Sequence, residues 1–133
     1  METVKLTFKD KLNILEKYNG RERIPSVLDC TTLILEMTGY QKLNEVLGKY
    51  DSVKSGIKFL RKYSGMNSMA DYLLDIGCVR VNPNEVQDFD FIHYEFHCGV
   101  YFDGYLFGVD ENGFFKYRNT TDLSELEIYR WQL

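Results

Sequence analysis

The hydrophobic pattern of this chain changes its period once, after Val79, and this change constrains the fold more than any other feature. Before it, apolar residues recur at helical spacing, as in residues 8–18, where Asn19 and Gly20 then supply a helix stop signal. After it, apolar and polar residues alternate with a period of two. Helices followed by such strands predict an α+β fold, with N-terminal helices packed on one face of a C-terminal antiparallel β-sheet.

The expected elements follow from local start and stop signals. The predicted helices cover residues 8–18, 30–37, 43–47, 52–63 and 69–74, and the predicted strands cover residues 89–94, 97–102, 105–109, 114–118 and 127–132. Asp103 and Gly104 form a tight hairpin signal between two of the strands. Asp29 is expected to be the N-cap of the second helix.

Composition narrows the class of protein. The chain has 133 residues with 44% apolar and 15% aromatic side chains, which predicts one globular domain over residues 1–133. The 16 basic and 20 acidic residues give a net charge of −4, which argues against nucleic acid as a partner. No stretch approaches the roughly 18 apolar residues that cross a bilayer, and no signal peptide is recognisable, so we expect no membrane span and no secretion by a leader.

The chain contains three cysteines, Cys30, Cys78 and Cys98, without CxxC spacing. This spacing predicts neither a zinc site nor a disulfide framework, and the sequence indicates no cofactor. Cys78 and Cys98 are expected to be core residues. At least one thiol is free, and the question is which of them is reactive.

Cys30 follows the expected N-cap directly. At that position, unpaired backbone N–H groups and the positive end of the helix dipole favour a thiolate, which is the nucleophilic form. The same N–H groups could hold the oxyanion that forms when a thiolate attacks a carbonyl. The alternative is that Cys30 is simply a small buried residue at a helix start.

His97 begins an alternating strand and is the expected general base for Cys30. The alternative is a strand-edge histidine that is satisfied by water. The second histidine, His93, lies four residues earlier. On a strand this spacing separates the two side chains by roughly 13 Å, too far for a shared metal ion without other ligands, so no metal site is predicted.

Three short segments together carry a family resemblance. Residues 28–31 read Leu-Asp-Cys-Thr, residues 89–92 read Phe-Asp-Phe-Ile, and residues 97–101 read His-Cys-Gly-Val-Tyr. In this order they resemble the motifs of the NlpC-type superfamily of papain-like cysteine peptidases and amidases. The resemblance implies a papain-like fold in which Cys30 is the nucleophile and His97 is the base.

The resemblance also assigns two supporting positions. The family has a tyrosine well upstream of the cysteine, with a proline between them, and Tyr18 and Pro25 match this arrangement, which places Tyr18 near the oxyanion. The family's third catalytic residue is a polar side chain on the strand after the histidine. Here that count reaches Gly108 or Val109, and Asp110 becomes the candidate only after a slip of one or two residues.

Residues 37–40, 48–50 and 55–56, together with Trp131, are similar to small proteins of tailed phages and prophages that are distant NlpC-type relatives. This similarity implies a phage-particle component, with other virion or tail proteins as partners, found in the virion or the host cytoplasm. Two functions stay open at this stage: a cysteine peptidase or amidase acting on peptidoglycan peptides, and a catalytically inactive virion structural or assembly protein. An intracellular deamidase or toxin-like transferase on the same fold is a third possibility.

Overall fold

A computed structural model describes residues 2–95, 97–119 and 122–131. The helices and strands, in chain order, are α1 (Phe8–Tyr18), α2 (Cys30–Met37), η1 (Leu43–Glu45), α3 (Val53–Ser64), α4 (Met69–Asp75), β1 (Cys78–Val81), η2 (Pro83–Glu85), β2 (Phe91–Tyr94), β3 (His97–Phe102), β4 (Tyr105–Val109), β5 (Phe115–Asn119) and β6 (Glu127–Trp131). Their order confirms the predicted α+β class.

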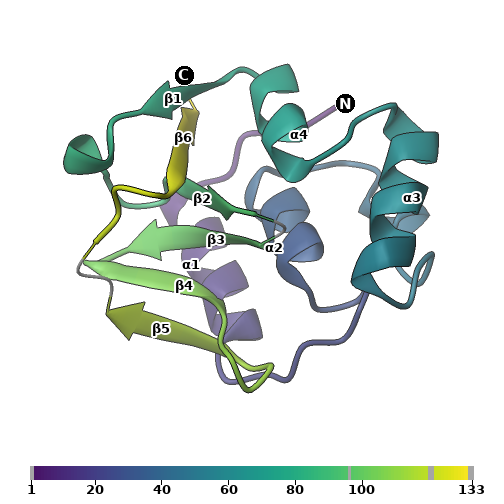
Figure 1. Ribbon diagram of the computed structural model, residues 1–133, viewed down its shortest axis with the longest axis horizontal. Coiled ribbons are helices and arrows are strands. Elements are labelled where there is room, and N and C mark those ends of the chain that lie inside the picture. Colours follow the sequence, from purple (N-terminus) through teal and green to yellow (C-terminus); the bar gives the residue numbers. More distant parts are fainter. Residues whose placement is uncertain (1, 96, 120–121, 132–133) are drawn as a thin grey trace.

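The strands form one six-stranded sheet in the order β1-β6-β2-β3-β4-β5, and every neighbouring pair is antiparallel. The last strand of the chain, β6, therefore lies between β1 and β2 rather than at an edge. The sequence analysis missed β1 and could not place β6 within the sheet. Figure 1 shows α2 between the sheet and α3.

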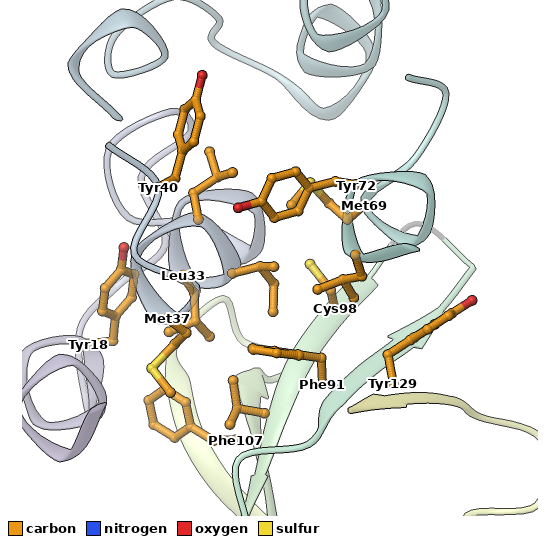
Figure 2. Close-up of a cluster of buried hydrophobic side chains, with 14 of the residues drawn as sticks. Tyr18, Leu33, Met37, Tyr40, Met69, Tyr72, Phe91, Cys98, Phe107 and Tyr129 are labelled. Atoms are coloured by element: carbon orange, nitrogen blue, oxygen red, sulfur yellow. The ribbon is translucent and has the colours of Figure 1, made fainter. Parts of the chain in front are cut away.

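The main core lies between α2 and one face of the sheet. Leu33 and Met37 of α2 are fully buried, and they belong to the same cluster as Phe91, Val100 and Phe107 from three adjacent strands. Figure 2 shows Leu33, Met37, Phe91, Phe107 and Cys98 gathered in this layer. We call this side of the sheet the inner face. Burial of these apolar side chains holds α2, and hence its first residue, against the sheet.

The opposite side, the outer face, has its own small cluster. Val81, Ile92 and Ile128 are buried there, each from a different strand. Because successive side chains of a strand point to opposite faces, Ile92 on the outer face fixes its neighbours Phe91 and His93 on the inner face. The face on which a strand residue lies decides which of the two histidines can reach the helices. Among the described residues, no helix is long and apolar enough to cross a membrane.

Candidate active site

Cys30 is the first residue of α2, as the N-cap signal predicted. Asp29 caps the helix: its Oδ1 accepts the Thr32 N–H at 2.8 Å, while Thr32 Oγ1 accepts the Asp29 N–H at 2.9 Å. This reciprocal pair is a capping box, which satisfies two backbone donors at the helix start. The N–H groups of Cys30 and Thr31 belong to the same first turn and have no acceptor within the helix itself.

The Asp29 carboxylate also ties this turn to two other segments. Its Oδ2 accepts the Ser26 N–H at 2.8 Å and the Tyr50 hydroxyl at 2.7 Å. The carboxylate is almost fully buried. Three hydrogen bonds to one buried charge therefore fix the loop before α2 and the loop before α3 around Cys30.

Cys30 lies on the wall of a cavity of about 120 Å³. The apolar part of the wall comes from α3 and the start of α4, with the side chains of Val53, Ile57, Leu60 and Met69. Arg23, Tyr50 and His93 also line the cavity. The site thus combines a thiol, an imidazole and a guanidinium around a space next to a helix N-terminus.

His93 is on the inner face of β2 and is mostly buried, with 14% of its side chain exposed. Its Nδ1 lies 3.0 Å from Oε1 of Glu127, which stands directly across from it on β6. A carboxylate only accepts hydrogen bonds, so the bonded Nδ1 carries a proton and Nε2 of the neutral ring is left as the proton acceptor. Histidine and glutamate together form an oriented base.

Other side chains hold Glu127 in its ionised form. The Tyr129 hydroxyl donates to the same Oε1 at 3.0 Å, and an Arg80 nitrogen lies 3.8 Å from Oε2. Burial acts to raise the pKa of Glu127, but the hydrogen bonds from Tyr129 and His93 and the charge of Arg80 bring it below its ordinary value. The carboxylate is therefore suited to orient His93 and to stabilise a charged imidazolium.

The structure does not bring His97 and Cys30 together. On β3, the inner face carries Cys98 and Val100, so His97 points to the outer face, and its side chain is exposed. In the sheet register His97 stands across from the exposed Tyr94, whereas His93 stands across from Cys98. Among the described residues that line the cavity, His93 is present and His97 is not.

Tyr18 and Asp110 also have positions other than those expected. Tyr18 is fully buried and donates its hydroxyl to Thr32 Oγ1 at 3.0 Å, so it supports the capping box from behind instead of facing an oxyanion. Asp110 directly follows β4, and its Oδ1 accepts the N–H groups of Asn112 and Phe114, which closes the β4–β5 turn. Neither is among the described residues that line the cavity.

Replacing Tyr18 by phenylalanine tests this reassignment. The variant loses one buried hydrogen bond to Thr32, so the free energy of unfolding should fall by about 1 kcal/mol, measured by denaturant titration. Any turnover at saturating substrate should stay at the wild-type level, because the Tyr18 hydroxyl is bonded to Thr32 and Tyr18 is not among the described residues that line the cavity. A large loss of turnover in a folded Tyr18→Phe protein would restore the oxyanion role.

The Cys30 thiol has a second cysteine beside it. Cys98, on the inner face of β3, donates from Sγ to the Cys30 carbonyl oxygen at 3.2 Å. The hydrogen bond from the Cys98 side chain, together with the Cys98 backbone and the charge of Arg23, holds the pKa of Cys30 below its usual range despite burial and the nearby Asp29. The pKa of Cys98 is raised well above its usual range, because it donates to Cys30 and is buried.

Comparisons with protein-family models, with curated proteins and with solved structures find no match to this chain. Within residues 2–95, 97–119 and 122–131, no group of three or more His, Cys, Asp or Glu side chains is placed to hold a metal ion.

Proposed function

We propose that the protein is a cysteine hydrolase of amide bonds, with Cys30 as nucleophile, His93 as general acid and base, and Glu127 as the residue that orients His93. One observation carries the proposal: His93, bound through Nδ1 to Glu127, shares a cavity with a thiol at the N-terminus of a buried helix. A nucleophile, a base and a third group that orients the base form the general pattern of such sites.

The chemical steps follow from these positions. The Cys30 thiolate attacks the substrate carbonyl, and the first-turn N–H groups of Cys30 and Thr31 stabilise the oxyanion. His93 Nε2 delivers the thiol proton, directly or through one water, to the leaving amine, which departs and leaves a thioester on Cys30. His93 then takes a proton from water, whose oxygen attacks the thioester and releases the carboxylic acid and the thiol.

Glu127 also bears on the choice between an enzyme and an inactive relative. Two sequence features favour an inactive virion protein: the vacant third catalytic position after the His97 strand, and the bulky Phe89 where the family has glycine. Glu127 supplies a polar side chain for the third position from β6, which lies beside β2. The enzymatic function is therefore the better supported of the two.

The backbone at Phe89 supports the proposed kinship with NlpC-type, papain-like enzymes. Phe89 occupies the position at which that family has glycine, and its φ is +69°, in the left-handed region that glycine favours. On this kinship we propose peptidoglycan peptides as the substrate class and a phage particle, with its other tail proteins, as the setting in which the protein acts.

The reactivity of Cys30 tests the proposal directly. Peptide-resolved labelling with iodoacetamide across pH should give a half-maximal rate for Cys30 below the ordinary thiol pKa of about 8.5, because the thiolate is stabilised. Cys98→Ala should move that midpoint upward, since the hydrogen bond that lowers the pKa is lost.

The other thiols serve as internal controls in the same digest. Cys78 should label only at much higher pH, because burial raises its pKa to about 12. A Cys30 midpoint at or above the ordinary thiol value, in folded protein, would contradict the proposed nucleophile.

A further inference from the structure

The nucleophile candidate and a second thiol lie side by side although 68 residues separate them in sequence. Cys30 is fixed at the start of α2, which packs on β3, and Cys98 is fixed in β3 itself. Cys98 Sγ is 3.2 Å from the Cys30 carbonyl oxygen, so the Cys98 side chain lies against the first residue of α2. Both side chains line the same cavity, so a small oxidant that reaches Cys30 meets both sulfurs.

We propose that Cys98 is a resolving thiol, and that a peroxide converts Cys30 and Cys98 into a disulfide that closes the site reversibly. The inference rests on the reactive Cys30 of the proposed function, but it requires no hydrolysis. It assigns a role to Cys98 that the hydrolytic steps leave unused.

The chemistry balances in two steps with hydrogen peroxide as the oxidant. The Cys30 thiolate attacks one peroxide oxygen, the O–O bond breaks, and hydroxide leaves, which yields the sulfenic acid of Cys30. The Cys98 sulfur then attacks the Cys30 sulfur, the S–O bond breaks, and the sulfenic oxygen departs as water with the Cys98 proton. Each cysteine loses one hydrogen atom, and one peroxide becomes two waters.

The protonation states of the two thiols fit these two reaction steps. The peroxide step requires a thiolate, and Cys30 is the cysteine whose pKa is lowered. Cys98 stays protonated until its partner is oxidised, because burial and the hydrogen bond to Cys30 raise its pKa. Its proton can then leave with the departing oxygen.

Cys78 is a matched comparison within the same chain. It is also a buried cysteine at the sheet, but it lies on β1, which is separated from β3 by β6 and β2. Burial raises the pKa of its thiol to about 12. Cys78 should therefore stay reduced when Cys30 and Cys98 pair.

The disulfide would inactivate the site by geometry. A disulfide holds its two sulfurs about 2.05 Å apart, so the Cys30 sulfur would be tied to β3 and removed from any substrate carbonyl. A reductant such as dithiothreitol should restore the thiol. Without Cys98, the sulfenic acid of Cys30 has no partner and continues to the sulfinic acid, which a thiol reductant does not reverse.

The test treats the native protein with hydrogen peroxide, quenches it in acid and measures intact mass and a peptide map. The wild type should lose the mass of two hydrogen atoms, its titratable thiols should fall from three to one, and the map should show Cys30 joined to Cys98. Cys98→Ser keeps a hydrogen-bond donor at this position but should instead gain the mass of two oxygen atoms at Cys30. Cys78→Ala should behave as the wild type does.

Several outcomes would overturn the inference. They are a Cys30–Cys78 linkage, identical products in wild type and Cys98→Ser, or oxygen added to Cys30 of the wild type without a disulfide. The wild-type map decides the question even if Cys98→Ser fails to fold. A disulfide in a protein without hydrolytic activity would leave this inference standing and remove the proposed function. Hydrolysis that depends on Cys30, in a protein that forms no disulfide with peroxide, would support the proposed function and overturn this inference.

Discussion

On the proposed function, His93→Ala is expected to lower kcat/KM for hydrolysis of a cell-wall peptide by about 10²–10⁴-fold, whereas His97→Ala should leave it unchanged. The reason is the phase of the two strands. His93 faces the cavity and is oriented by Glu127, while His97 points to the outer face and is exposed. The chain contains only these two histidines, so the pair of variants covers every imidazole that could act as the base.

The choice of substrate makes this experiment sharper. When an amide bond is cleaved, the leaving group is an amine, which needs a proton from His93. When p-nitrophenyl acetate is cleaved, the leaving group is p-nitrophenolate, which needs no proton. The loss in His93→Ala should therefore be larger for the peptide than for the ester. Equal activity of His93→Ala and wild type on both substrates, or a loss confined to His97→Ala, would exclude His93 as the base.

The start of α2 was predictable because its signals are local. Asp29 was expected as the N-cap, and the structure has it there, with Thr32 completing a capping box that the sequence analysis did not predict. A helix N-cap depends on the chemistry of neighbouring residues, so the position of the thiol at a helix tip could be inferred without knowledge of the fold.

The choice between His93 and His97 depended on which face of the sheet each side chain points to. The sequence contains this information in its alternating pattern, but the match to the family's histidine motif pointed to His97 instead. In residues 97–102, the alternation separates His97 and Gly99 from Cys98 and Val100. The apolar set is the one that packs on the helices, and this pattern could have shown that His97 faces outward. The match to a family's histidine position favoured the opposite orientation.

Glu127 could not have been found from local pattern. It follows His93 by 34 residues, and its place beside His93 depends on β6 entering the sheet between β1 and β2. Strand order in an antiparallel sheet is set by packing between distant segments, which period and turn signals do not encode. The third residue of the site is therefore a consequence of topology.

Asp29→Ala is expected to lower the free energy of unfolding by about 3 kcal/mol, because three buried donors lose their acceptor at once. These donors are the N–H groups of Ser26 and Thr32 and the Tyr50 hydroxyl. Denaturant titration with an unchanged m-value measures the loss. Asp29→Asn should lose less, since its amide oxygen still accepts, but its NH₂ group meets a donor on the other side.

Thr7→Ala is the matched control for this prediction, because Thr7 is also an N-cap in a capping box but is exposed. It should cost only about 1 kcal/mol, the usual value for a helix cap. The difference between the two variants then measures what the buried bonds to Ser26 and Tyr50 add around Cys30. If both variants lose the same amount, Asp29 acts as an ordinary cap, and the rigidity of the proposed nucleophile must come from packing of α2 on the sheet.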